Sequence, residues 1–238
     1  VSNVTHELKT PLTSIRGFVD TLKEGAIHDP NVSMRFLDII DIEAERLSRL
    51  ISDVLSLSEI EQRKGGEIVY CNVAQVVGDV DEILQMKMKK KKKELKKSGK
   101  KGSDVKLFVD LGKDIPDYPC DESHMKEVLI NLVDNALKYT LEGSVTLRVF
   151  EWNHILHIQV KDTGIGIAKE HLPRLFERFY RVDKGRSRKQ GGTGLGLSIV
   201  KQIVDLYGGT IKVDSNLGYG TTFRIYFPYD RPEERRVG

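Results

Sequence analysis

Apolar residues recur at helical spacing in two stretches at the start of the chain. In residues 2–24 the steps are four, three, four and three, at Leu8, Leu12, Ile15, Val19 and Leu22. Residues 32–61 repeat these steps at Ile40, Ala44, Leu47, Ile51 and Val54. The spacing is typical of bundle seams, and residues 25–31, with Gly25 and Pro30, predict the connecting loop. One hairpin cannot bury both seams, so we expect two hairpins to form a dimeric four-helix bundle.

Residues 67–229 mix helical and alternating patterns, after a linker at residues 63–66 that contains two glycines. The predicted order is a helix over 73–95, a strand over 105–110, a helix from a capping Ser123 to residue 140, strands over 145–149 and 156–160 with a turn at Asn153, a helix over 194–207, and strands over 210–215 and 221–227. The predicted fold class is therefore α+β. A helical hairpin over residues 1–62 precedes an α/β sandwich with its helices on one face, and the charged tail 230–238 is expected to be disordered.

Three motifs in the second domain predict one nucleotide site. They run from Asn131 to Tyr139, from Asp162 to Gly166 and from Gly192 to Gly196. Glycines let the backbone approach phosphates closely, and amides at the start of a helix bind anions. Asparagine oxygens can complete the octahedral shell of Mg²⁺. The chain has no P-loop, and the glycines lack the strand–turn–helix context of a Rossmann site.

The first helix carries a second candidate for chemistry. His6, Glu7 and Thr10 fall off the apolar seam, so we expect them to face solvent. A neutral imidazole can act as a nucleophile at physiological pH. Pro11 removes a helical N–H and predicts a local bend. The alternatives are a structural histidine and, for Thr10, a plain helical threonine before proline.

Together with Phe176-Glu-Arg-Phe179, these motifs and their order resemble bacterial two-component sensor histidine kinases over residues 2–228. The resemblance implies a dimerisation and phosphotransfer hairpin joined to a Bergerat-type ATP-binding domain. It implies autophosphorylation on His6 from ATP, transfer to an aspartate of a response regulator receiver domain, and dephosphorylation of that regulator. The run over residues 12–18 is similar to the phosphate-responsive and cell-wall sensors of Gram-positive bacteria.

Roles for single residues follow from the chemistry and this resemblance. In the hairpin, Glu7 accepts or orients the imidazole proton and Thr10 orients a water for regulator dephosphorylation. The nucleotide roles are Mg²⁺ ligation by Asn135 with support from Asn131, phosphate neutralisation by Lys138, packing by Tyr139, adenine recognition by Asp162, close loop passage at Gly164 and Gly166, and a phosphate cradle at Gly192, Gly194, Leu195 and Gly196. The basic segment 181–190 is expected to be a lid over ATP, with Gly191 in its hinge.

Plainer readings stay open for several of these residues. Asn131 could hydrogen-bond from helix to strand, Asp162 could form an ordinary Asp-x-Gly turn, and Phe176 and Phe179 could be core. A gyrase- or Hsp90-like hydrolase is a rival function, but such enzymes carry a glutamate where this chain has Asn131. A non-catalytic docking module is the other rival, and the intact motifs argue against it.

Composition adds the setting. Charged residues make up 31% of the chain, and no run of about 18 apolar residues occurs. We expect a soluble fragment whose missing N-terminal part anchors it on the cytoplasmic side of the bacterial membrane, because the chain begins just before His6. Cys71 and Cys120 show no metal or redox spacing, which fits a reducing compartment.

The net charge of +3 is unevenly distributed. Residues 87–101 hold ten lysines and one glutamate, so this segment carries +9 and the remainder of the chain −6. Such a run can contact nucleic acid or anionic membranes. Because no aromatic residues interleave the lysines, we favour a solvated helix end and predict no nucleic-acid partner.

Overall fold

The computed structural model describes residues 2–62, 69–97, 104–182 and 192–228. The predicted linker 63–66, nearly all of the lid, Gly191 and the tail lie outside the described residues. The chain divides into two compact units. The first combines Val1–Gln62 with Glu177–Gly196, and the second combines Arg63–Phe176 with Leu197–Gly238.

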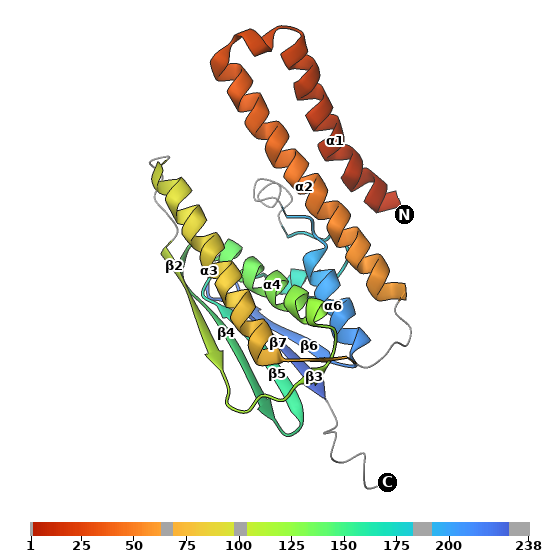
Figure 1. Ribbon diagram of the computed structural model, residues 1–238, viewed down its shortest axis with the longest axis vertical. Coiled ribbons are helices and arrows are strands. Elements are labelled where there is room, and N and C mark those ends of the chain that lie inside the picture. Colours follow the sequence, from red (N-terminus) through yellow and green to blue (C-terminus); the bar gives the residue numbers. More distant parts are fainter. Residues whose placement is uncertain (1, 63–68, 98–103, 183–191, 229–238) are drawn as a thin grey trace. The chain divides into compact units, whose positions relative to one another are not determined.

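The first unit contains the predicted hairpin. Helices α1 (Ser2–Lys23) and α2 (Pro30–Gln62) are joined through η1 (Ala26–His28), and α1 continues through Pro11 (Figure 1). The second helix begins two residues before its predicted start. The Asp29 carboxylate accepts hydrogen bonds from the Asn31 and Val32 amides (2.9 and 3.2 Å), and Pro30 suits a first helical position because its missing N–H is not needed there.

The buried row of α2 differs from the predicted seam by one position. Arg46, Leu50, Leu57 and Ile60 are buried, whereas Ile51, a predicted seam residue, is 46% exposed. The helix therefore carries two neighbouring rows at bundle spacing, one buried in this chain and one open. The open row, which we call the α2 stripe, consists of Met34, Leu37, Ala44, Ile51 and Leu55.

The second unit is built on a five-stranded sheet, which with the hairpin confirms the predicted fold class. Strands β2 (Asp104–Leu111), β4 (Glu142–Trp152), β5 (Ile155–Asp162), β7 (Gly220–Pro228) and β6 (Thr210–Asn216) lie in that order. The β2–β4 pair is parallel and the other pairs are antiparallel. Buried and less buried residues alternate along β4, β5 and β7. Helices α3 (Val73–Lys97), α4 (Glu122–Tyr139) and α6 (Gly196–Leu206) cover one face (Figure 1).

Several boundaries correct the sequence prediction. Asp121, not Ser123, caps α4, because its carboxylate accepts the Ser123 amide (2.9 Å) and hydroxyl (2.6 Å). Helix α6 begins at Gly196 rather than at Gly194, whose φ of 79° is outside the helical range. Helix α3 extends through residues 87–97, so most of the lysine run is helical.

Besides η1, which lies in the predicted loop, three described elements were not predicted. Short strands β1 (Tyr70–Cys71) and β3 (Tyr118–Pro119) pair antiparallel, and η2 (Lys169–Arg174) follows the Asp162 loop. Two residues are too few to show an alternating pattern. Among the described helices, none is both long and apolar enough to cross a membrane.

Candidate functional site

Helix α4 carries two asparagines whose side chains differ in their hydrogen bonds. Asn131 donates its amide N–H to the Glu127 carbonyl one turn earlier (3.0 Å), so its hydrogen bond stays within the helix. The side chain of Asn135 is partly exposed and makes no hydrogen bond with any residue that the structure describes. Its carboxamide oxygen is therefore available to a ligand, and this favours Asn135 over Asn131 as a metal ligand.

The next residues complete the end of α4. The Lys138 ammonium lies 5.9 Å from the Tyr139 ring centroid, and both side chains are partly exposed. Thr140 closes the helix by donating its hydroxyl to the Ala136 carbonyl (2.8 Å). A cation thus stands one turn after Asn135, where it can meet phosphate charge.

Asp162 is a buried carboxylate at the end of β5, and the described residues donate hydrogen bonds to one of its two oxygens. Oδ1 accepts hydrogen bonds from the Gly164 amide (2.8 Å) and the Thr221 amide (3.2 Å). Among the described residues nothing donates to Oδ2. Burial raises the pKa of Asp162, and the two backbone hydrogen bonds act in the opposite direction. The Oδ2 atom is therefore a single, well-held acceptor.

The glycines of this loop are required by the protein's own packing. A Cβ at Gly164 would lie 2.4 Å from the Tyr139 carbonyl oxygen, and one at Gly166, where φ is 66°, would lie 2.0 Å from the Asn216 carbonyl oxygen. Side chains cannot be accommodated at such distances. Gly164 thus lets the Asp162 loop lie against the end of α4, and Gly166 lets it lie against the end of β6. These contacts are a reason for the glycines in addition to the predicted approach of a nucleotide.

In the first unit, His6 is exposed on α1. Its ring makes no hydrogen bond with any described residue, while its carbonyl accepts the Thr10 hydroxyl (3.1 Å). Nothing in this unit that the structure describes therefore occupies the imidazole nitrogens. The Thr10 hydroxyl uses its hydrogen in this bond to the helix backbone, and the lone pairs of the hydroxyl oxygen can still accept a hydrogen bond from a water.

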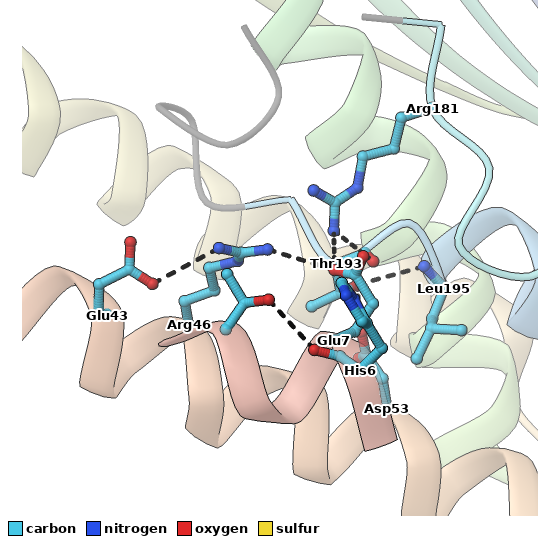
Figure 2. A network of polar contacts seen from close by, with 9 residues as sticks. His6, Glu7, Glu43, Arg46, Asp53, Arg181, Thr193 and Leu195 are labelled. Carbon is cyan, nitrogen blue, oxygen red and sulfur yellow. Dashed lines mark hydrogen bonds and ion pairs between the residues drawn. The ribbon is translucent and has the colours of Figure 1, made fainter. Parts of the chain in front are cut away.

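Glu7 belongs to a charge network (Figure 2). Its carboxylate lies 3.4 Å from the Arg46 guanidinium and 3.5 Å from that of Arg181. The Arg46 side chain is only 3% exposed and also contacts Glu43 at 3.5 Å. A buried guanidinium needs such partners, because an uncompensated ion is costly to bury. The network fixes the position of Glu7 beside His6.

The glycine-rich segment is tied to α2 within the same unit. The Thr193 hydroxyl donates to the Asp53 carboxylate, and the Arg181 guanidinium donates to the Thr193 carbonyl (2.6 Å; Figure 2). Burial raises the pKa of Asp53. The Phe179 amide, in a residue with φ of 64°, donates to the Gly194 carbonyl (2.9 Å). These contacts hold both flanks of residues 183–191.

The predicted phosphate cradle begins α6. Gly192, Gly194 and Gly196 are partly exposed, whereas Leu195 is fully buried and its amide points to the Thr193 hydroxyl at 3.3 Å. The Leu195 side chain is therefore part of the hydrophobic core. The start of α6 at Gly196 is a helix N-terminus, a kind of site where backbone amides can bind phosphate.

Two family models match the chain. Residues 1–63 match the His Kinase A (phospho-acceptor) domain, and residues 120–231 match the histidine kinase-, DNA gyrase B-, and HSP90-like ATPase. Sensor histidine kinase WalK of Bacillus subtilis is 38% identical, over 98% of this chain and 37% of its own length. Sensor protein SrrB of Staphylococcus aureus is 37% identical, over 98% of this chain and 38% of its own.

The chain belongs to the sensor histidine kinases. It spans less than two-fifths of the length of these curated relatives. Among solved structures, histidine kinase ThkA in complex with response regulator protein TrrA superposes with a TM-score of 0.72 and 26% identity, over 98% of this chain and 62% of that one.

Sequence reasoning missed two residues of the network around Glu7. Asp53, which is partly exposed on α2, accepts the Thr193 hydroxyl. Arg46 is buried on the same row of α2 as Leu50 and Leu57. A charged residue on an apolar ladder was the available signal, since burial of such a charge requires a partner. The identity of that partner, Glu7 on another helix, cannot be read from spacing along one helix.

Proposed function

We propose that this histidine kinase phosphorylates His6 from ATP and then transfers the phosphoryl group to an aspartate of a response regulator receiver domain. The observation that carries the proposal is the pairing of an exposed, unengaged imidazole at His6 with the network that fixes Glu7 beside it. The regulator is proposed because ThkA, a structural relative, was solved with one. One oxygen each of Asn135 and Asp162 accepts no hydrogen bond from any described residue, and this supports a nucleotide site in the same chain.

The chemical step uses few groups. A ring nitrogen of His6 attacks the γ-phosphorus, the bond to the bridging oxygen of the diphosphate breaks, and ADP leaves with that electron pair. Glu7 accepts the proton from the other ring nitrogen. Arg46 and Arg181 act as positioning residues, because they hold the Glu7 carboxylate. Positioning and charge neutralisation dominate phosphoryl transfer.

Mg²⁺ would neutralise triphosphate charge, with Asn135 as its protein ligand. Its carboxamide fits this role, since it is partly exposed and makes no hydrogen bond to the described protein. No group of three or more His, Cys, Asp or Glu that could hold a metal occurs in the described part of the chain. This agrees with an ion bound chiefly by phosphates and water. Lys138 adds a second positive charge near the phosphates.

The proposal is tested with γ-labelled ATP and Mg²⁺. Label on the protein should be lost in acid and retained in base, as expected of a phosphoramidate. Release of labelled phosphate without protein labelling would instead indicate a hydrolase of the gyrase or Hsp90 type. Binding of a regulator without any turnover would indicate a docking module.

The adenine site yields a prediction at Asp162. In Asp162→Asn the side-chain oxygen can still accept hydrogen bonds from the Gly164 and Thr221 amides, while an NH₂ group, which is a donor, replaces Oδ2. It then opposes the adenine amino group, so we expect ATP affinity to fall about 10- to 100-fold. Inosine triphosphate carries an acceptor oxygen in place of the adenine amino group, so its affinity should fall less in Asp162→Asn than that of ATP. Equal losses for both nucleotides, measured by calorimetry, would rule out this contact.

The same carboxylate gives the pH dependence. The raised pKa of Asp162 means that the parent loses its ionised acceptor at a higher pH than an ordinary aspartate. ATP affinity should therefore hold above that pKa and fall as pH drops through it, whereas Asp162→Asn should not follow this titration.

We also propose a homodimer. The α2 stripe leaves Met34, Leu37 and Leu55 at least half exposed, and Leu12 on α1 is 56% exposed. Apolar rows of this length on a hairpin favour a second hairpin as the partner. The full-length protein is proposed to be anchored by a region outside this chain, with these domains on the cytoplasmic side of the membrane, because its relatives are sensor proteins of greater length.

Dimer formation predicts a strong effect of Ile51→Asp. The new carboxylate would be buried without a partner, and a penalty of several kcal/mol corresponds to a dimer Kd at least about 100-fold weaker. Ser52→Asp is the matched control, since it places the same charge on an adjacent exposed position of α2. Sedimentation velocity should show a dimer for the parent and Ser52→Asp, and mostly monomer for Ile51→Asp. A monomeric parent would contradict the proposal.

Regulator dephosphorylation is proposed for Thr10. Its oxygen lone pairs lie one turn from His6 on α1. Thr10→Ala should spare autophosphorylation, since alanine is a better helix former, and should lengthen the life of the phosphorylated regulator several-fold. Thr10→Ser keeps the hydroxyl and should behave as the parent. The measurement is the decay of label on a regulator that accepts it from the parent, with ADP present; identical decay with Thr10→Ala and parent would leave Thr10 a purely structural role.

A further inference from the structure

The two cysteines, 49 positions apart in the sequence, meet inside the second unit. Cys71 and Cys120 are free thiols whose sulfur atoms are 3.2 Å apart. Both are almost fully buried, at 2% and 3% exposed. The β1–β3 ladder holds them together, because Cys71 pairs with Tyr118 across the ladder and Cys120 follows directly after β3.

Each cysteine stands just before the first turn of a helix. Cys71 precedes Asn72, whose side chain accepts the Gln75 amide at the start of α3 (2.9 Å). Cys120 precedes Asp121, the cap of α4. Capped helix starts and a strand pair restrict backbone motion on both sides, so the sulfur atoms stay near each other. A disulfide needs them only about 1.1 Å closer.

We propose that Cys71 and Cys120 are a dithiol site that a hydroperoxide converts reversibly to a disulfide. The Cys71 thiolate attacks a peroxide oxygen, which forms a sulfenic acid and releases hydroxide. The Cys120 sulfur, on losing its proton, attacks the Cys71 sulfur and expels a second hydroxide. Two thiols and one H₂O₂ thus give one disulfide and two waters, and two electrons pass from sulfur to oxygen.

The contact between the thiols indicates which reacts first. The hydrogen bond between the two sulfur atoms lowers the pKa of Cys71 and, together with burial, raises that of Cys120. Burial and the carboxylates of Glu122, Asp117 and Asp121 oppose the effect at Cys71. Cys71 is therefore the attacking thiol and Cys120 the resolving one.

The bond would link the starts of α3 and α4. Helix α4 carries Asn131 and Asn135, so the crosslink would anchor the nucleotide helix to β1, the first described element of the second unit. It would also close a loop over residues 71–120, which restricts the unfolded chain. The oxidised protein should unfold at a higher temperature than the reduced protein, and dithiothreitol should abolish the difference.

The test is intact mass after exposure of the full chain to H₂O₂ and trapping of free thiols with N-ethylmaleimide. We expect a species lighter by two hydrogen atoms that takes up no maleimide. Without reduction, trypsin should release residues 65–87 joined to residues 114–126, because lysines between them are cut. Cys71→Ala and Cys120→Ala should each lose the crosslink and the rise in unfolding temperature.

A denatured parent sample supplies the matched control, since the same oxidant should then yield far less intramolecular product. The proposal is overturned if the folded parent keeps two maleimide-reactive thiols after this treatment. Crosslinks between chains only, or sulfinic acid at one cysteine, would overturn it equally. Because the test measures a mass, its result does not depend on whether the protein has kinase activity.

Discussion

Replacing His6 by alanine should abolish labelling of the chain by γ-labelled ATP. The proposed nucleophile is the imidazole, and α1 (Ser2–Lys23), which the structure describes throughout, contains no second histidine. We expect labelling to fall by at least about 1,000-fold, a loss of roughly 4 kcal/mol of transition-state stabilisation. His6 lies in the first compact unit, whereas Asn135 and Asp162, the residues proposed to hold Mg²⁺ and adenine, lie in the second. ATP affinity should therefore change by less than about twofold, well under 1 kcal/mol.

Two controls make this result specific. His28 is an exposed histidine of the same unit, and His28→Ala should label as the parent does. Glu7→Gln keeps the shape of the neighbouring side chain but removes the proton acceptor, so it should slow labelling without shifting ATP affinity. Acid-labile label retained in His6→Ala would exclude His6 as the acceptor.

The sequence predicted the helices of the hairpin well because each carries an apolar ladder over many turns. Part of the predicted row is exposed in the single chain, because α2 carries two such apolar rows. One contains Ile51 and is open, and the other contains Leu50 and Leu57 and is buried. Periodicity shows that a face is apolar but not which partner covers it. The open row is what a second subunit would need.

The remaining misses concern residues brought together from distant positions. Glu7 meets Arg46, Asp53 meets Thr193, and Cys71 meets Cys120. No spacing rule relates such pairs, since their proximity depends on the completed fold. The residue that caps α4 also could not be chosen from the sequence alone. Asp121 and Ser123 are both good caps by type, but the backbone of Asp121 is extended (φ −70°, ψ 130°), as a cap requires, whereas Ser123 already lies within α4.

The sequence ranked Asn135 above Asn131 as the proposed metal ligand, and the structure adds a contact that supports this order. Asn131 and Asn135 are one helical turn apart and chemically identical. Only the hydrogen bond from Asn131 to Glu127 separates them. Likewise Gly164 and Gly166 signal a tight loop in the sequence, and the structure adds the carbonyl oxygens that exclude a side chain.

This ranking leads to the second large effect, at Asn135. Asn135→Ala removes the carboxamide oxygen proposed to bind Mg²⁺, so labelling should fall by at least about 100-fold, or roughly 2.7 kcal/mol. The helix should tolerate alanine, which is the better helix former. Asn131→Ala is the matched control on the same helix. Its side chain already bonds within the helix, so we expect a smaller loss, about tenfold or less.

The Mg²⁺ dependence of ATP affinity shows whether Asn135→Ala has lost a metal ligand or has disturbed the fold. ATP affinity of the parent should rise with Mg²⁺ over that in EDTA, and this gain should persist in Asn131→Ala. In Asn135→Ala the gain should shrink toward zero, while affinity in EDTA and the unfolding temperature stay close to the parent's. An unchanged Mg²⁺ gain would exclude Asn135 as the ligand. Equal loss in both variants would mean that the two asparagines share the ion, and the hydrogen bond to Glu127 would then have to break when the nucleotide binds.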